Sequence, residues 1–524
     1  MPDKCCPECG AKYVKYGFDI PFETFLGFKG DKTPDIDLNF SAEAQVNAHA
    51  YTKVMFGDDH SFRAGVINTL KDKTVFGYAK SFCDHIGMSP THAELHRLVM
   101  GCTGVKRTTG QHPGGMVVVP PGYEAEDFMP LQYPANNPDG NGLITHFDFH
   151  AMDDKLVKLD ILGHVDPTAL RLMQEMTGLN PRDIPLDDKD TRALFSTSEP
   201  LKIDLSEINC DLGTIGIPEY GTTFVRGILK NTRPTTIEEL VRLAGLSHGT
   251  NVWQGNAETL VMSGKAGLGD VIGTRDDIML FLISKGSDPL LAFKTMESVR
   301  KGKGLTPEME ENMKKLSLPD WYIPSCKLIK YMFPRAHAAA YLTMAFRVAY
   351  YKMHYPQEFY AVYYTTRADD FDIISCSGGA EKVLKTKRQF EAAVKAAGRD
   401  TKTKSGESVA KLNNLSSILE VVYEMNLRGI EFLPIDINES DATKFKVKDG
   451  NLLPPFNAIG GLGAGNAEKI VEFRNKYGKQ FTAVDEFQRV TGAGDSIMEK
   501  LEALGCFEGL MASAQTSLFD TLSF

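Results

Sequence analysis

The stretch from Pro34 to Phe40 alternates strictly between polar and apolar residues. Its polar positions are Asp35, Asp37 and Asn39, and the residues between them are apolar. This period predicts a half-buried β-strand whose apolar residues face a core and whose acids face outward. Carboxylates at positions i and i+2 lie about 6–7 Å apart on one strand face, and a divalent cation such as Mg2+ would offset their repulsion. An edge strand with acids that merely face water is the alternative.

Two later segments repeat this alternation. His146–His150 alternates polar and aromatic residues, and Val157–Gly163 places Lys158 and Asp160 on one face. Together with the first segment they predict one sheet that gathers acidic side chains on one face.

Two metal sites are compatible with this predicted sheet. Asp35, Asp37 and Asp160 can supply a two-metal cage, with Lys158 placed to neutralise a phosphate. A second set, His146, Asp148 and His150, can ligate a transition metal, although its flanking phenylalanines favour a structural strand. The pattern alone leaves both sets open.

Residues 101–115 interrupt the alternation. They are rich in glycine and also carry Lys106, Arg107 and His112. We expect a loop that leads into a strand over Met116–Val119 and offers backbone N–H groups and cations to phosphate. A mobile connector is the alternative.

Helical patterns occupy two further regions. Residues 63–98 predict short amphipathic helices, and residues 167–366 predict long ones. The basic run Arg300–Gly304 precedes a helix start at Thr306-Pro307, where cations favour anions; a solvated loop is the alternative.

A second helix of this region, which begins near Pro334, places two aromatic side chains on one face. His337 and Tyr341 stand at i and i+4 beside alanines that leave room for a flat base. A tightly packed alanine interface explains the same pattern.

Two features near the C-terminus suggest binding surfaces. The turn Gly461-Leu462-Gly463 precedes an Ala-x-x-Ile helix and resembles a helix-hairpin-helix module, whose glycines let backbone N–H groups reach DNA phosphates. The peptide Gln515–Phe519 ends in two large apolar residues and would otherwise pass as a frayed terminus.

Composition narrows the class of protein without deciding it. The 524 residues suggest about three domains. The net charge of −10 counts against a general nucleic-acid coat protein but permits an enzyme with local basic grooves. With no apolar run of about 18 residues and no signal-peptide pattern, we expect a cytoplasmic protein without a membrane anchor. The nine cysteines are spread thinly, which favours reduced thiols.

Cys6 and Cys9 form half of a zinc knuckle. Structural zinc needs four ligands, usually from two such pairs, and no second Cys-x-x-Cys follows. We expect either that a partner pair precedes this sequence or that the site is lost.

Six motifs together carry a resemblance to a known family. They are residues 35–40, 106–115, 158–163, 245–250, 300–304 and 333–341. In combination they closely resemble the C-terminal part of the PolC-type DNA polymerase III alpha subunits, the C-family replicative DNA polymerases of Gram-positive bacteria.

The resemblance implies an α+β fold. It comprises an N-terminally incomplete palm of the polymerase-β-like nucleotidyltransferase type, a helical thumb and fingers, and a helix-hairpin-helix domain. The implied segments are 1–16 (partial zinc element), 17–64 and 106–166 (palm), 65–105 (thumb), 167–430 (fingers), 431–510 (helix-hairpin-helix duplex-binding domain) and 511–524 (clamp-binding tail).

The resemblance also implies site residues. Asp35, Asp37 and Asp160 match catalytic aspartates that hold two Mg2+ ions, which makes Asp148 a palm-sheet residue. Candidate contacts to nucleotide or DNA are Lys106, Arg107, His112, Lys158, Arg275, Lys301, Lys303, Arg335, His337, Gly461 and Gly463. Gln515, Leu518 and Phe519 match a sliding-clamp peptide, in which Thr516 replaces the usual Leu and is expected to reduce clamp affinity.

The implied function is template-directed DNA synthesis from deoxynucleoside triphosphates on primer-template DNA. A Gly-Ser triphosphate motif and the exonuclease of the family are missing, so we expect a fragment or one half of a split polymerase. Its partner would be an N-terminal half with PHP, exonuclease and palm segments.

Two alternative functions stay open. One is a non-catalytic DNA- and clamp-binding subunit, and the other is a metal nuclease built on His146, Asp148 and His150. An incomplete palm would expose a sheet edge and lower solubility.

Overall fold

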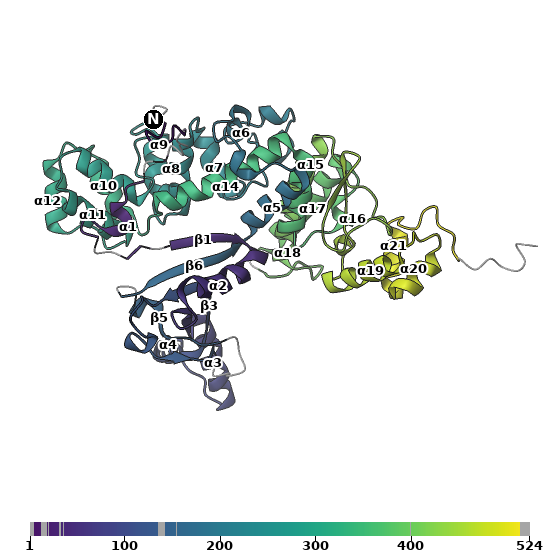
Figure 1. Cartoon of the computed structure of the whole chain (residues 1–524), viewed down its shortest axis with the longest axis horizontal. Coiled ribbons are helices and arrows are strands. Elements are labelled where there is room, and N and C mark those ends of the chain that lie inside the picture. Colours follow the sequence, from purple (N-terminus) through teal and green to yellow (C-terminus); the bar gives the residue numbers. More distant parts are fainter. Residues whose placement is uncertain are drawn as a thin grey trace, which may run out of the picture. The chain divides into compact units, whose positions relative to one another are not determined.

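The computed structural model describes residues 5–11, 18, 20–30, 33–34, 36–134, 142–152, 155–398 and 400–513. The chain divides into two compact units (Figure 1). Pro21–Thr168 forms one, here called the sheet unit. Met1–Ile20 and Ala169–Phe524 form the other, called the helical unit. The fold is therefore α+β.

Within the described residues of the sheet unit, six strands form one mixed sheet in the order β1-β6-β3-β2-β5-β4. The strands are β1 (Ile36–Ser41), β2 (Ser61–Thr69), β3 (Lys106–Val118), β4 (Leu131–Gln132), β5 (Ile144–Asp148) and β6 (Val157–His164). The predicted strands thus lie in one sheet. β1 occupies the edge of the sheet as described, and it pairs in parallel with β6.

The glycine-rich stretch is a strand, so the prediction of a loop over residues 101–115 is wrong from Lys106 onward. β3 pairs with β2 on both sides of a register shift between Arg63 and Gly65, which leaves residues 112–115 outside this pairing. The glycines permit close packing: a Cβ on Gly114 would lie 2.5 Å from Leu162 Cδ2, and one on Gly65 would lie 2.0 Å from the Thr145 carbonyl oxygen. Glycine here lets backbones approach, rather than supplying flexibility.

Helices accompany the sheet. They are α1 (Glu23–Leu26), α2 (Ala42–Phe56), α3 (Asp72–His85) and α4 (His92–Cys102). The last two confirm the predicted short helices, but the helical prediction is wrong for residues 63–69, which belong to β2. A Cβ on Gly163 would meet the Gln45 side chain of α2, so α2 covers the face that holds Ile161, which is 2% exposed. Leu38 of β1 lies on the same face but is 39% exposed. The apolar side of the edge strand is therefore only partly covered, contrary to the expected burial.

Helices dominate the helical unit, as predicted. After α5 (Val165–Thr177), which leads in from the sheet unit, they are α6 (Lys189–Ala193), α7 (Thr223–Thr232), α8 (Ile237–His248), α9 (Glu258–Met262), α10 (Arg275–Ser284), α11 (Pro289–Arg300), α12 (Pro307–Lys315), α13 (Tyr322–Leu328), α14 (Arg335–His354), α15 (Pro356–Arg367), α16 (Ile373–Cys376), α17 (Gly379–Ala397), α18 (Val409–Leu427), α19 (Ala464–Tyr477), α20 (Val484–Thr491) and α21 (Asp495–Ala503). A hairpin of β7 (Lys446–Lys448) and β8 (Asn451–Leu453) precedes α19. In the described part of the chain, none of the helices combines the length and apolar character needed to cross a bilayer.

A buried ion pair joins three of these helices. Lys352 of α14 and Glu424 of α18 are both 0% exposed, and the lysine Nζ lies 2.7 and 2.9 Å from the two carboxylate oxygens. Nζ also donates to the carbonyls of Gly213 and Ile215, and Tyr360 of α15 donates its hydroxyl to Glu424. Such a network satisfies each charge with several hydrogen bonds, as buried charges require.

Candidate active site

Asp37 and Asp160 are neighbours across two parallel strands. They are direct register partners in the β1–β6 pair, so their side chains share one face and their strands lie about 4.8 Å apart. Asp37 is exposed and Asp160 is partly buried. Asp35, the third acid expected here, lies outside the described residues. Two of the three expected carboxylates are therefore brought together.

The oxygen atoms of this face suit a hard divalent cation. Asp160 Oδ1 and Asn39 Oδ1 are both buried and lack a hydrogen-bond partner within the described residues, and Asn39 shares the face of Asp37 because it follows two residues later on β1. Buried oxygens without donors are costly unless a cation takes their lone pairs. Among described residues no cluster of three His, Cys, Asp or Glu forms a metal site. The residues present fit Mg2+ as part of a cage.

Lys158 occupies the position expected for it. Its Nζ lies 3.0 Å from Asp160 Oδ2 and 4.9 Å from the centroid of the Phe149 ring. The same amine therefore neutralises one oxygen of Asp160 while the other oxygen stays open to a cation.

His112 is neutral and oriented by backbone groups. Its Nδ1 accepts hydrogen bonds from the N–H groups of Gly115 (2.7 Å) and Gly114 (3.2 Å). An accepting Nδ1 carries no proton, so its 3.7 Å approach to Asp160 Oδ1 is not an ion pair. Burial is the main cause that lowers the pKa of His112. Its remaining proton is on Nε2, which is therefore a hydrogen-bond donor at neutral pH.

The residues that hold this segment escaped the sequence prediction. Arg63 of β2 donates to the carbonyls of His112 (2.9 Å) and Pro113 (3.1 Å) and also bonds His49 of α2. Gln45 donates to the carbonyl of Ile161 at 2.9 Å. Burial lowers the pKa of Arg63. No local signal marks Arg63, because Ser61–Thr69 does not alternate strictly and the sequence prediction for residues 63–98 is helical.

The alternative metal set, His146, Asp148 and His150, is only partly described. β3 and β2 separate β5, which carries His146 and Asp148, from β6. His146 Nδ1 lies 2.7 Å from Gln132 Oε1, and the side chain of His150 lies outside the described part. The geometry favours a structural strand for this segment.

Lys106 and Arg107 stand apart from His112. They begin β3, whereas Gly115 near its end pairs with Asp160. At about 3.3 Å per residue, Lys106 is up to roughly 30 Å from that end. Both are exposed, so they are placed for a ligand that extends well beyond the acids.

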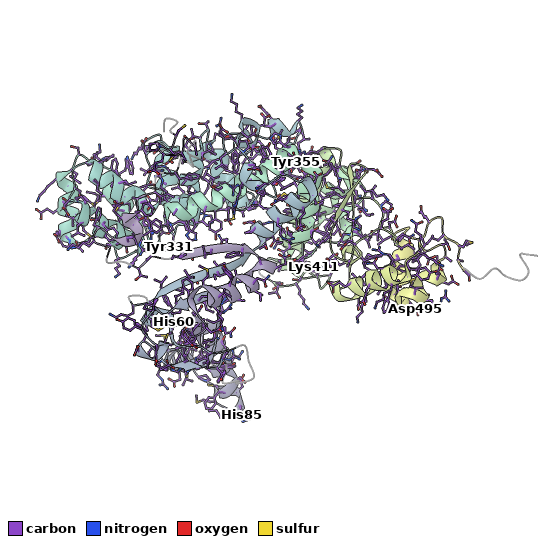
Figure 2. The ribbon with its side chains drawn as sticks, viewed as in Figure 1. His60, His85, Tyr331, Tyr355, Lys411 and Asp495 are labelled. Carbon is purple, nitrogen blue, oxygen red and sulfur yellow. The ribbon has the colours of Figure 1, made fainter. Side chains whose placement is uncertain are left out.

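The basic run Arg300–Gly304 is held against a neighbouring loop. A Cβ on Gly302, whose φ is +68°, would lie 2.4 Å from the Lys330 carbonyl oxygen. The next residue of that loop, Tyr331 (labelled in Figure 2), forms a β-bridge with Thr250. Lys303 is exposed, and Lys301 Nζ lies 3.4 Å from Glu297. The predicted helix start is confirmed, because Thr306 caps α12.

Four rings form a ladder in the helical unit. His248 stacks on Phe333 (4.8 Å between centroids), Phe333 contacts His337 (5.3 Å), and His337 stacks on Tyr341 (5.5 Å). Ala338 and Ala339 are buried on the other side of α14. The packed-alanine interpretation therefore holds for Ala338 and Ala339, and the approach of a base to the face of His337 and Tyr341 stays a prediction.

The first ring of the ladder is tied to an acid. His248 Nε2 lies 2.8 Å from a carboxylate oxygen of Glu219. This hydrogen bond is the main cause that raises the pKa of His248. The imidazole at this end of the ladder is thus biased towards its cationic form.

Arg275 and Arg335 are buried rather than presented to a ligand. They are 4% and 9% exposed. Arg335 bonds Asp277 (3.2 Å) and Glu238 (2.6 Å), and its backbone N–H donates to Asp276. These acids satisfy the desolvated guanidinium of Arg335 in this structure, and the expected contact of Arg275 and Arg335 with triphosphate or template stays a prediction.

The glycine turn leads into α19 and lies beside several acidic side chains. Gly461 has a φ of +87° and Gly463 caps the N-terminus of α19. Lys500 donates to the Gly460 carbonyl at 2.7 Å. A cavity of about 660 Å³ beside the turn is also lined by Asp369, Asp370, Asp372, Glu407 and Lys411. These acids oppose phosphate on that side of the turn.

The remaining expected sites are a cysteine turn and the tail. The Gly10 N–H donates to the Cys6 carbonyl (2.9 Å) in a tight turn, and no third ligand joins Cys6 and Cys9 within the described residues. Gln515, Leu518 and Phe519 lie outside them.

Comparisons with known proteins match almost the entire chain. The model of the bacterial DNA polymerase III alpha NTPase domain matches residues 12–87 and 78–163, that of the alpha subunit finger domain matches residues 166–317, and a helix-hairpin-helix motif matches residues 429–517.

Curated relatives extend these matches. The chain is 51% identical over 519 residues to DNA polymerase III PolC-type of Caldanaerobacter subterraneus subsp. tengcongensis, 52% identical to that of Listeria monocytogenes and 50% identical to that of Staphylococcus aureus. Each alignment covers 99% of this chain and 35–36% of the relative. The chain thus spans about a third of the length of these proteins and belongs to the PolC-type DNA polymerase III family.

Proposed function

We propose that this chain provides the nucleotidyl-transfer site of a replicative DNA polymerase, with the sheet unit as a polymerase-β-like palm. The observation that carries the proposal is the direct register of Asp37 with Asp160, beside Lys158 and two buried oxygens without donors. A vestigial site would have no reason to keep buried oxygens unpaired.

In this proposal Asp37 and Asp160, with Asp35, hold Mg2+. Bound Mg2+ supplies Lewis-acid activation of the primer 3′-hydroxyl and neutralises charge on the triphosphate. Lys158 sets the orientation of Asp160 through the 3.0 Å contact. His112 offers its Nε2 proton to a phosphate oxygen.

Other residues would bind the substrates. The ring ladder from His248 to Tyr341 presents flat faces on which a base can stack. Lys301 and Lys303 are exposed cations for phosphate, and Lys106 and Arg107 are placed for duplex away from the acids. The glycine turn at Gly461 and Gly463 would contact the DNA backbone through N–H groups on the side away from its acidic neighbours, and the tail would bind a sliding clamp.

Primer extension tests the proposal. The chain is assayed with Mg2+, primer-template and deoxynucleoside triphosphates, alone and with the part of the relatives that it does not cover. Asp37→Asn should lower extension at least about a hundredfold, because it removes charge that the transition state needs. Asp59→Asn, an exposed acid of the same unit, is the matched control.

Equal extension by Asp37→Asn and its control would refute the catalytic role. Duplex binding with no extension under either condition would support the non-catalytic DNA-binding alternative instead.

A further inference from the structure

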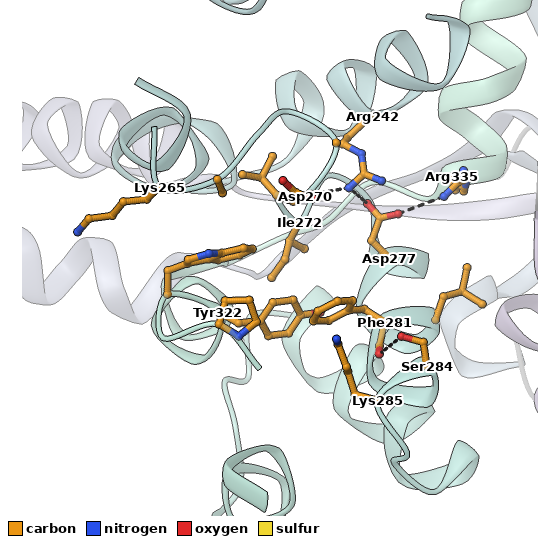
Figure 3. A pocket seen from close by; sticks show the side chains of 16 residues that line it. Arg242, Lys265, Asp270, Ile272, Asp277, Phe281, Ser284, Lys285, Tyr322 and Arg335 are labelled. Carbon is orange, nitrogen blue, oxygen red and sulfur yellow. Dashed lines mark hydrogen bonds and ion pairs between the residues drawn. The ribbon is translucent and has the colours of Figure 1, made fainter. Parts of the chain in front are cut away.

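A cavity of about 630 Å³ lies within the helical unit (Figure 3), and none of the four ladder rings lines it. Its wall comes from α8, the segment 265–272, α10 and α13. This size is in the range of pockets that bind small organic molecules, about 300–1,000 Å³. None of the site residues proposed above lines it except Arg335.

One wall of the cavity is aromatic. Phe281 and Tyr322 lie with ring centroids 4.8 Å apart, and Trp321 follows at 5.6 Å from Tyr322. Tyr322 is 2% exposed, whereas Phe281 and Trp321 are only partly buried. The two partly buried rings leave π surface available to a planar group.

The opposite wall is charged. Arg242 and Arg335 flank Asp277, at 3.7 and 3.2 Å, as Figure 3 shows. Arg242 Nε and Arg335 Nε have no hydrogen-bond partner among the described residues. Buried donors without partners are uncommon in a self-sufficient core.

Two exposed lysines complete the lining. Lys265 and Lys285 project from different elements, and Lys285 Nζ lies 5.3 Å from the Phe281 ring centroid. With Asp270 the ionisable lining has two more cations than acids. The cavity therefore combines aromatic faces with a net positive charge, which is complementary to an aromatic anion.

We propose that this cavity binds a nucleoside phosphate as an effector. The base lies against Phe281 and Trp321, and the phosphates reach Lys265 and Lys285. The site is separate from the nucleotidyl-transfer site; the binding can be tested apart from the proposed function, on which the role as an effector rests.

Two residues that line the cavity belong to the helices that carry rings of the ladder. Arg242 belongs to α8, which ends at His248, and Arg335 begins α14, which carries His337 and Tyr341. Both arginines line the cavity, so an occupant lies between the two helices that hold the ladder. Binding would therefore restrain the rings on which we propose that a base stacks.

Tryptophan fluorescence tests the site directly. The chain has two tryptophans; Trp253 is 3% exposed and Trp321 lines the cavity. GDP and ADP are titrated into the full chain in EDTA, which suppresses metal-dependent binding at the acids. We expect saturable quenching that is lost in Trp321→Phe, while calorimetry of that variant still detects binding.

Charge-reversed variants separate the cavity from other sites. Lys265→Glu/Lys285→Glu should raise the dissociation constant roughly tenfold or more, whereas Lys294→Glu, an exposed lysine of α11 outside the cavity, should leave it unchanged. Asp37→Asn should also bind normally. An absence of saturable quenching and heat at millimolar nucleotide, or equal affinity in the double variant, would overturn the proposal. Equally tight binding of pyrophosphate alone would overturn the assignment of an aromatic ligand.

Discussion

Removing the acid of the buried ion pair should strongly destabilise the helical unit. In Glu424→Gln the shape of the side chain is retained, but Lys352 loses its charged partner and keeps only neutral acceptors, the carbonyls of Gly213 and Ile215 and the new amide oxygen. Breaking a buried pair from one side costs about 3–5 kcal/mol, because the remaining charge stays desolvated. We therefore expect a decrease of that size in the free energy of unfolding at pH 7.

The pH dependence gives this prediction a second, independent readout. Burial lowers the pKa of Lys352 to about 8 even beside Glu424, below the ordinary value of 10.5. Between these values the unfolded chain binds more protons, so the free energy of unfolding rises with pH. Without Glu424 the lysine pKa falls further, and the rise should begin at a lower pH in the variant.

Urea unfolding followed by tryptophan fluorescence is the assay, because Trp253 and Trp321 both lie in the helical unit. Glu381→Gln, an exposed glutamate of α17, is the control and should change little. Glu424→Gln/Lys352→Met should recover part of the loss because it removes the unpaired charge. A loss below about 1 kcal/mol for Glu424→Gln, or a pH profile that parallels the wild type, would refute this reasoning.

Three further changes test separate parts of the structure. Gly114→Ala should destabilise the sheet unit by about 1–3 kcal/mol, since its Cβ would lie 2.5 Å from Leu162; pulse proteolysis in urea measures this, and Gly110→Ala, with only an ordinary 3.4 Å contact, is the control. His248→Gln should remove a stabilising effect that is complete below pH 6.5 and lost as pH rises through the raised His248 pKa; unfolding midpoints from pH 5 to 9 would show it, and an unchanged profile would contradict it. Asn39→Ala should weaken Mg2+-dependent extension with no loss of stability, because Asn39 Oδ1 has no described hydrogen bond to lose; equal activity at limiting Mg2+ would exclude it as a ligand.

The arginines show where prediction by resemblance and physical environment diverge. A sequence motif indicates that Arg275 and Arg335 are near a functional centre, but it does not indicate exposure. Both side chains are buried, and Arg335 forms hydrogen bonds with Asp277 and Glu238 on other helices. The acids that neutralise Arg335 are 58 and 97 residues away in sequence, so no local pattern identifies them.

The sequence by itself predicted the helical unit, the strands that carry the acids and the parity of those acids. Period-2 alternation is a local property, so it places Asp37 and Asp160 on strand faces without further information. The same local rules misread residues 106–115 as a loop, because glycine is ambiguous between flexibility and close packing. That choice depends on neighbours such as Ile161 and Leu162 beside Gly114, which lie far along the chain.

Only the tertiary structure decided which strands are neighbours. Asp37 and Asp160 are 123 residues apart, and their register is set by pairing between β1 and β6, a non-local hydrogen-bond pattern that no periodicity encodes. The unpaired oxygens of Asp160 and Asn39 and the neutral tautomer of His112 likewise arise from neighbours that folding brings together. Alternation selects a face for each acid, and strand order selects the acids that share a cation.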